Sequence, residues 1–201
     1  MNEKRYDEST VKELKKGLRK HNMQILNIHG YNGSPHNAAY AALNENSCQE
    51  ITAPSIEYDA ESPEIILERL RRIIVEKQIE LIIGTSLGGF FAAVLSAELN
   101  LPVIFVNPCL MPFHHLPRLG FQGNIKPFIP LFGTLAKLES DNVSCIVGAD
   151  DEVIDTHDFT ERMLGNARFR RIPGGKHSGA TLPLKTYFGE MLYYYTEILP
   201  R

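Results

Sequence analysis

The chain has 201 residues, of which 43% are hydrophobic and 22% are charged, and these values fit one globular domain with a sizeable single core. The formal net charge of -3 at pH 7 excludes the strongly basic field by which many proteins bind nucleic acids or anionic membrane surfaces. We therefore expect a single domain over residues 1–201 that binds neither nucleic acid nor a membrane.

The predicted elements alternate between short apolar strands and longer helical patterns along most of the chain. The first is an amphipathic helix at about residues 9–21. Strands are then expected at 24–28, 50–53, 81–83, 103–106, 143–147 and 168–172, and helices at 35–43, 63–76, 89–99, 156–164 and 182–199. This alternation predicts an α/β fold in which a mostly parallel sheet carries helices on both faces.

The segment at about residues 108–140 is the exception to this alternation, because five prolines stand there among four phenylalanines. Connections of that length in a compact domain are usually functional or disordered, and this one is too apolar for disorder. We expect a short cap-like insertion over a substrate site. Candidate pocket residues are Phe113 and Phe121, together with Asn32; the alternative is that the phenylalanines pack onto the helices that flank the sheet.

The stretch ELIIGTSLGGFFAAVLSAEL, residues 80–99, places the pattern G-x-S-x-G between a predicted strand and a predicted helix. Gly84 and Gly88 keep side chains out of a crowded strand-to-helix turn, and Ser86 at the bend projects its hydroxyl beside the positive end of the helix. The five-residue pattern alone also occurs in ordinary turns, but the strand before it and the helix after it favour Ser86 as a nucleophile.

The strand at 24–28 runs into the turn His29-Gly30-Tyr31-Asn32-Gly33. A glycine at the second position frees backbone N–H groups to point at the site, so the Tyr31 amide is expected to be one donor of an oxyanion hole. The Leu87 amide, directly after the nucleophile, is expected to be the other. His29 itself is expected to be a structural hydrogen-bonding residue, and the alternative for the whole turn is a glycine-rich loop without a catalytic role.

Acid and base candidates follow the last two predicted strands. Asp150, Asp151 and Asp155 compete for the acid that orients an imidazole, although aspartate is also common in loops and helix caps. His177, on the glycine-rich turn before the last helix, is the expected general base. The other histidines considered are expected to be surface or packing residues: His21, His36, His114, His115 and His157.

The cysteines and the start of the chain bear on its location. Cys48, Cys109 and Cys145 lack C-x-x-C spacing, which indicates neither a disulfide framework nor a zinc site. The first ten residues are too polar for a signal peptide, and no apolar run approaches the roughly 20 residues that span a bilayer. These features predict a cytoplasmic protein.

The chain resembles the α/β-hydrolase superfamily, and more narrowly the small YqiA-like esterases, which are compact bacterial hydrolases of acyl esters and thioesters. The resemblance rests on LNIHGYNGSP, IIGTSLGGFFA, VIFVNPCLMP, VGADDEVID and IPGGKHSG. It implies Ser86 as nucleophile, His177 as base and Asp151 as acid, since the family's acid stands three residues after the glycine that is Gly148 here. The N-terminal helix has no counterpart in the family, and residues 110–140 match poorly.

We expect from these residues a serine hydrolase that cleaves small-molecule carboxylic esters or thioesters through an acyl-enzyme, with no metal or other cofactor. A thioesterase or a peptidase with the same fold is the nearest alternative. Another is a non-catalytic hydrolase-fold protein that holds a ligand or partner with CLMPFHHLPRLGF, residues 109–121. A metal site at His114 and His115 is disfavoured, because adjacent histidines rarely both bind one metal. The residues favour no particular oligomeric state.

Overall fold

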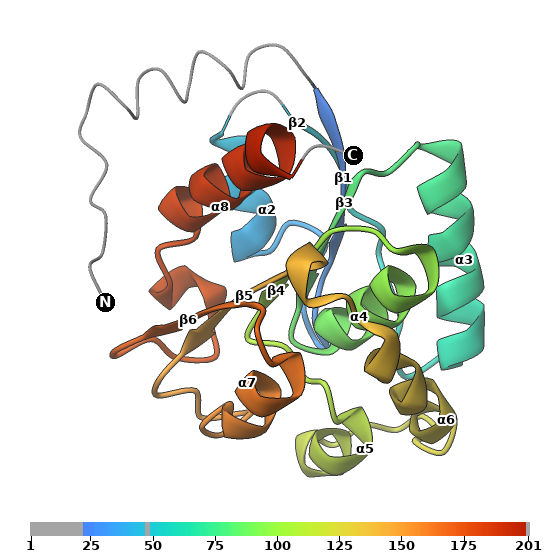
Figure 1. Ribbon diagram of the computed structural model, residues 1–201. Helices are drawn as coiled ribbons and strands as arrows, with labels where there is room; N and C mark the ends of the chain where they lie inside the picture. The colour runs from blue at the N-terminus through green and yellow to red at the C-terminus, as the bar shows by residue number, and fades with distance from the viewer. Residues whose placement is uncertain (1–21, 47–48, 200–201) are drawn as a thin grey trace.

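The computed structural model describes residues 22–46 and 49–199, so the helix expected at 9–21 and Cys48 lie outside the described residues. The centre of the fold is a six-stranded sheet in the order β2-β1-β3-β4-β5-β6, in which every neighbouring pair is parallel (Figure 1). The predicted α/β class is confirmed. The strands are β1 Met23–Ile28, β2 Gln49–Thr52, β3 Leu81–Thr85, β4 Val103–Val106, β5 Val143–Gly148 and β6 Arg168–Ile172.

Helices cover both faces of this sheet, as expected. The main helices are α2 Ala38–Asn44, α3 Pro63–Glu76, α4 Leu87–Leu99, α7 Asp158–Leu164 and α8 Leu184–Tyr193. Figure 1 shows α2 and α8 on one side of the sheet and α3 and α4 on the other. The buried apolar residues accordingly form two clusters, one under α3 and α4 and one under α2 and α8.

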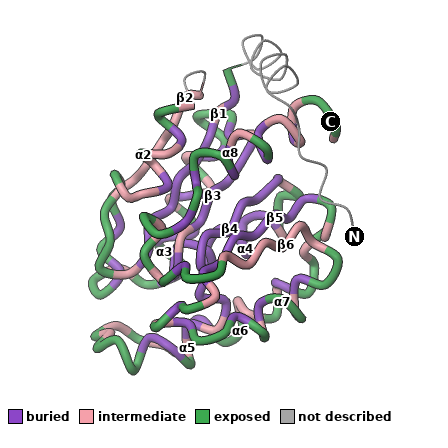
Figure 2. Tube along the Cα trace, turned by 90° about the vertical axis from the view of Figure 1, so that its left-hand side faces the viewer, coloured by how far each residue is buried: buried purple, intermediate pink, exposed green. Residues whose placement is uncertain are grey.

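The central strands are apolar because both of their faces are covered. All residues of β4 and β5 are buried, and Figure 2 shows the buried trace running through the middle of the sheet. The edge strand β6 is only partly buried and carries three arginines in its sequence RFRRI. The near-continuous apolar runs of β4 and β5 are typical of strands in parallel sheets, which explains why the sequence predicts these central strands well.

Three helices begin later than the sequence pattern predicts, each for a local reason. Helix α2 begins at Ala38 because the Asn37 side chain accepts the Tyr40 N–H as an N-cap. Helix α7 begins at Asp158 because His157 has a left-handed φ of 57°. Helix α8 begins at Leu184, after Pro183, because the residue before a proline disfavours helical backbone. A π-helical turn, Tyr194–Ile198, then continues α8.

The segment between β4 and β5 folds into short helical pieces rather than a long loop. They are α5 Pro112–His115, η2 Leu116–Leu119, α6 Phe128–Phe132, η3 Gly133–Lys137 and η4 Ser140–Asn142, and η5 Gly179–Thr181 stands separately before α8. The fully buried Phe128 ring makes edge contacts with Phe90 and Phe91 of α4. These contacts fix the segment to the helix that follows the predicted nucleophile.

Within residues 22–46 and 49–199, every helix is too short or too polar to cross a membrane.

Candidate active site

Ser86 lies at a sharp turn between β3 and α4. Its backbone has φ 51° and ψ -121°, and a positive φ is uncommon for any residue other than glycine. Three hydrogen bonds hold it there: the Ser86 N–H donates to Val106 O at 3.0 Å, and the Ser86 carbonyl accepts from Gly89 N at 2.8 Å and Cys109 N at 2.9 Å. Strained backbone that the surrounding structure fixes in this way clusters at functional sites.

Gly84 and Gly88 are required because neighbouring atoms leave no room for a side chain at either position. A Cβ on Gly88 would lie 2.2 Å from the Ile28 carbonyl oxygen, and one on Gly84 would lie 2.6 Å from the Ala92 Cβ. The first turn of α4 therefore presses against the end of β1. The two glycines of the G-x-S-x-G pattern allow this packing, as the pattern predicts.

The structure brings Ser86, His177 and Asp151 together from the ends of three strands. His177 Nε2 lies 3.1 Å from Ser86 Oγ, and His177 Nδ1 lies 2.9 Å from Asp151 Oδ2. A carboxylate can only accept hydrogen bonds, so Nδ1 carries the proton and Nε2 faces the hydroxyl as an acceptor. These contacts have the geometry required by the nucleophile, base and acid roles that the sequence analysis predicts for the three residues.

Burial separates Asp151 from the other two acid candidates. The Asp151 side chain has no exposed surface, whereas Asp150 and Asp155 are exposed. Burial by itself raises the pKa of Asp151, but hydrogen bonds from His157, His177 and the Ile154 amide outweigh that effect and hold the pKa well below its ordinary range. Asp151 is therefore a carboxylate at neutral pH, and its position fits the acid role that the resemblance implies.

Asn107 connects the loops that carry the acid and the base, a role that the sequence analysis missed. Its buried side chain accepts from the Gly148 N–H at 2.8 Å and donates to the carbonyl oxygens of Lys176 at 2.9 Å and His177 at 2.8 Å. The residue follows β4 with a φ of 45°. Because asparagine tolerates left-handed backbone, an asparagine directly after a buried strand was the available signal.

The turn after β1 lies beside the Ser86 hydroxyl. A Cβ added to Gly30 would lie 2.8 Å from Ser86 Cβ and 3.4 Å from Ser86 Oγ, and the Gly33 N–H closes the turn on the Gly30 carbonyl at 3.0 Å. Tyr31 follows Gly30 in this turn, and Leu87 is the first residue of α4. Both predicted oxyanion donors therefore belong to backbone that adjoins the hydroxyl.

The Tyr31 side chain ties this turn to the segment between β4 and β5. Its hydroxyl donates to Asp59 Oδ2 at 3.0 Å, and Asp59 Oδ1 accepts from the Gln122 N–H at 2.8 Å. Burial first, and then the bond to Asp59, raise the pKa of the Tyr31 phenol. The Tyr31 ring also makes an edge contact with Phe121, with ring centroids 5.6 Å apart. Asp59 is thus a second residue that the sequence analysis missed.

The three predicted pocket residues have different surroundings. Phe121 contacts Tyr31 and also Phe128, at 6.1 Å between ring centroids. Phe113 packs edge-on against Phe132 at 5.4 Å. Asn32 is exposed and has a φ of 56°. Of the three, Phe121 and Asn32 lie on or beside the turn that adjoins Ser86.

His29 is held by backbone groups on both ring nitrogens, which fits the structural role expected for it. Its Nε2 accepts from the Ile56 N–H at 3.1 Å, so the proton lies on Nδ1, which donates to the Gly30 carbonyl at 2.8 Å. The Tyr58 hydroxyl donates to the His29 carbonyl at 2.5 Å. The loop after β2 thereby supports the turn that precedes Tyr31.

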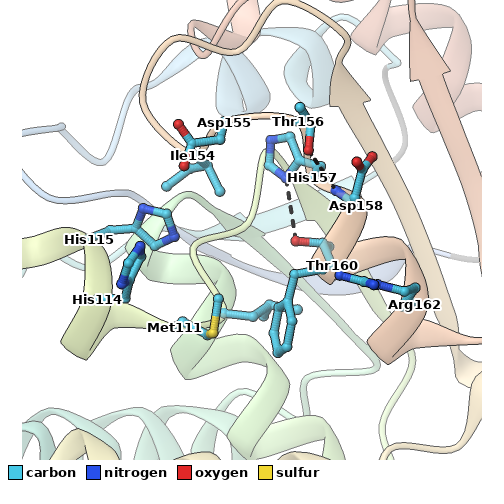
Figure 3. A pocket seen from close by; sticks show the side chains of 12 residues that line it. Met111, His114, His115, Ile154, Asp155, Thr156, His157, Asp158, Thr160 and Arg162 are labelled. Atoms are coloured by element: carbon cyan, nitrogen blue, oxygen red, sulfur yellow. Dashed lines mark hydrogen bonds between the residues drawn. The ribbon is translucent and has the colours of Figure 1, made fainter.

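A cavity of about 260 Å³ lies between α5 and α7, and Figure 3 shows His114, His115 and His157 around it. His115 is buried, and the His114 and His115 rings contact each other at 4.9 Å. Burial and the neighbouring His114 lower the pKa of His115. Within residues 22–46 and 49–199, no three His, Cys, Asp or Glu side chains are grouped as a metal site requires.

A known protein family matches more than half of the chain. The family described as "Uncharacterised protein family (UPF0227)" matches residues 24–127, which is just over half of the 201 residues. The matched range includes the turn after β1, the G-x-S-x-G elbow, α5 and η2, and it ends directly before α6. Asp151 and His177 lie beyond it.

Solved structures with the α/β-hydrolase fold resemble this one over most of its length. MGS-MChE2, an α/β hydrolase enzyme from a lagoon-sediment metagenome, has a TM-score of 0.60 at 13% identity and covers 90% of this chain and 93% of its own. Est1E from Butyrivibrio proteoclasticus has a TM-score of 0.60 at 15% identity and covers 86% of this chain and 89% of its own. An α/β serine hydrolase homologue from Coxiella burnetii has a TM-score of 0.58 at 14% identity and covers 87% of this chain and 86% of its own. These similarities establish a shared α/β-hydrolase fold.

Proposed function

The chain belongs to the uncharacterised protein family UPF0227 and has the α/β-hydrolase fold, and from this premise we propose that it is a serine hydrolase of carboxylic esters or thioesters. The observation that carries the proposal is the 3.1 Å contact between Ser86 Oγ and His177 Nε2, with Asp151 on the opposite ring nitrogen. A serine is a weak nucleophile near neutral pH unless an adjacent base takes its proton.

In the first half of the reaction, Ser86 Oγ attacks the acyl carbon while His177 Nε2 takes the hydroxyl proton. Asp151 holds the imidazole in the required tautomer and stabilises the imidazolium. The backbone N–H groups of Tyr31 and Leu87 stabilise the oxyanion, each lowering the barrier by roughly 3 to 4 kcal/mol. The carbon–oxygen or carbon–sulfur bond to the leaving group then breaks, and His177 returns the proton to that group.

In the second half, water releases the acid from the acyl-enzyme. His177 takes a proton from the water, the resulting hydroxide equivalent attacks the acyl carbon, and the bond to Ser86 Oγ breaks. The proton on His177 returns to Ser86 Oγ, which restores the starting state. The transfer between Ser86 Oγ and His177 Nε2 joins atoms that lie 3.1 Å apart in the structure, and the transfers to the leaving group and from water use the same imidazole nitrogen.

We place the acyl chain of the substrate beside Tyr31 and Phe121. The edge contact between the two rings puts an apolar side chain of the β4–β5 segment next to the turn that adjoins the nucleophile. Apolar surface next to the reacting carbon favours an acyl chain longer than acetyl, since each additional buried CH₂ contributes roughly 0.8 kcal/mol of transfer free energy. A small-molecule ester or thioester is therefore the proposed substrate class.

A fluorophosphonate probe tests the proposed function, because it labels a serine only where a neighbouring base activates it. The folded protein is treated with the probe, and the modified residue is mapped by mass spectrometry. We expect labelling at Ser86, no labelling of Ser86→Ala, and thermal stability of that variant near wild type. Labelling at another serine contradicts Ser86 as the nucleophile, whereas no labelling of the folded protein contradicts a serine hydrolase and favours a non-catalytic binding protein.

A further inference from the structure

The carboxylate of Asp151 binds two histidines. His157 Nε2 lies 2.8 Å from Asp151 Oδ2, and His177 Nδ1 lies 2.9 Å from the same oxygen. The side chains of Asp151 and His157 both have no exposed surface, whereas the His177 side chain is 20% exposed. His157 therefore lies on the inner side of the acid, away from the face that the reaction uses.

The backbone places His157 in this position. The residue stands directly before α7 with φ 57° and ψ 15°, and its carbonyl accepts the Glu161 N–H at 2.9 Å. Its Nδ1 lies 3.4 Å from Thr160 Oγ1, the contact drawn as a dashed line in Figure 3. One left-handed residue thus turns the imidazole inward, toward Asp151, instead of along the helix.

The direction of the hydrogen bond follows from the ionisation of the acid. Asp151 is a carboxylate, so His157 Nε2 must donate to it. Its other oxygen, Oδ1, accepts the backbone N–H groups of Val153 and Ile154, both at 2.8 Å. The two amides fix one oxygen and His157 fixes the other, which leaves the carboxylate one orientation in which it also meets His177.

From this geometry we propose that His157 is a positioning residue for the hydrolytic reaction: its Nε2–H holds Oδ2 of Asp151 in the orientation that His177 requires. The inference rests on the proposed function, because it assigns a role in the same site. Without this donor, Oδ2 of the buried carboxylate loses one of its two hydrogen bonds, and only the two amides on Oδ1 and His177 itself still orient Asp151. Small misplacements of a catalytic group reduce rates by as much as about 100-fold.

The kinetic test compares two replacements of His157. His157→Leu removes the donor, and kcat on a p-nitrophenyl ester is expected to fall by roughly 10- to 100-fold with KM nearly unchanged, since His157 does not bind substrate. His157→Gln keeps an N–H donor near the Nε2 position and is expected to restore most of kcat. His114→Gln, an exposed residue on the same cavity, is the matched control. A His157→Leu protein that is folded and keeps the wild-type kcat overturns the proposal, as does a His157→Gln protein as slow as His157→Leu.

A second readout does not depend on hydrolysis. Histidine-selective ¹⁵N NMR of the full chain is expected to show the proton of His177 on Nδ1 and that of His157 on Nε2. His157→Leu is expected to shift the His177 Nδ1–H resonance, and His157→Gln to shift it less. An unchanged His177 resonance in His157→Leu overturns the proposal even if Ser86 is labelled. A shifted resonance in a protein that the fluorophosphonate does not label supports the positioning of Asp151 and rejects the hydrolase function alone.

Discussion

Asn107 donates a hydrogen bond from Nδ2 to the carbonyl oxygen of His177 at 2.8 Å, and this bond fixes the loop that carries the proposed base. The same side chain accepts from Gly148, at the end of the strand that leads to Asp151. One buried amide at the end of β4 therefore sets the distance between the loops after β5 and β6. The relative placement of acid and base depends on a residue that takes no part in the chemistry.

Asn107→Gly removes these bonds while allowing the backbone φ of 45°. We expect the free energy of unfolding to fall by about 1 to 3 kcal/mol, because the buried Gly148 N–H and two partly buried carbonyl groups lose their partner, and we expect kcat/KM to fall with it. Urea unfolding and ester hydrolysis measure the two effects. Gln78→Gly, at an exposed site with a φ of 52°, is the control. A variant equal to wild type in both measurements would show that the side chain does not hold these loops.

Replacement of the two adjacent aspartates separates the acid from its neighbour. Asp151→Asn is expected to lower kcat by on the order of 10⁴-fold, because the amide favours the wrong imidazole tautomer and carries no charge. Asp150→Asn alters an exposed side chain and is expected to have a mild effect. The measurement is hydrolysis of a p-nitrophenyl ester by both variants. The reverse ranking would place the acid one residue earlier in the loop.

The lowered pKa of Asp151 predicts that the free energy of unfolding depends on pH in the acidic range. Because its pKa in the folded protein lies below the ordinary value of 3.8, ionised Asp151 stabilises the fold at pH values above that number, and the contribution disappears as pH falls toward the folded-state pKa. We expect the stability difference between wild type and Asp151→Asn to shrink between about pH 5 and about pH 2. Urea unfolding across this range checks it. A constant difference is incompatible with the lowered pKa.

Gly88 can be tested for the close packing that places Ser86. Gly88→Ala would put a Cβ 2.2 Å from the Ile28 carbonyl oxygen, so we expect a loss of about 1 to 3 kcal/mol of stability from overpacking and weaker fluorophosphonate labelling. Gly133→Ala is the control, because nothing in the described part of the chain lies within 4 Å of its added Cβ. Equal thermal stability of the two variants would mean that α4 can move away from β1 without cost.

The aromatic residues between β4 and β5 are tested by substrate length. Phe121→Ala is expected to change the preference among p-nitrophenyl esters more than Phe113→Ala does, because Phe121 contacts Tyr31 whereas Phe113 packs on Phe132. Each additional CH₂ in contact with Phe121 contributes roughly 0.8 kcal/mol in wild type. The measurement is kcat/KM against acyl chain length. Parallel profiles for all three proteins would place the acyl pocket elsewhere.

The sheet and the positions after its strands could be predicted from the sequence because both depend on local patterns. Apolar runs such as 143–147 mark strands buried on both faces, and the parallel order brings Ser86, Asp151 and His177 to one edge of the sheet. The G-x-S-x-G spacing then distinguishes Ser86 from other serines. These inferences rest only on patterns among residues close in sequence and on the general rule that sites lie at the carboxyl ends of parallel strands.

The partners of these residues could not be predicted, because they depend on single backbone angles and on long-range contacts. His157 was expected to be a surface or packing residue, and only its φ of 57° turns it toward Asp151. The hydrogen bond from the Gln122 N–H to Asp59 joins residues 63 positions apart, and the one from Asn107 to the His177 carbonyl joins residues 70 positions apart. No periodicity in the sequence indicates which of many polar side chains will make such contacts.

The left-handed backbone of Ser86 also has a thermodynamic consequence. A non-glycine residue in such a region costs on the order of 1 to 3 kcal/mol, and the hydrogen bonds that Ser86 donates to Val106 and accepts from Gly89 and Cys109 maintain this conformation. In the proposed reaction, the serine hydroxyl is therefore already oriented before substrate binds, so little of the binding energy has to be used to reshape the protein. For the proposed hydrolase, the lost folding stability is exchanged for a rigid, preorganised nucleophile.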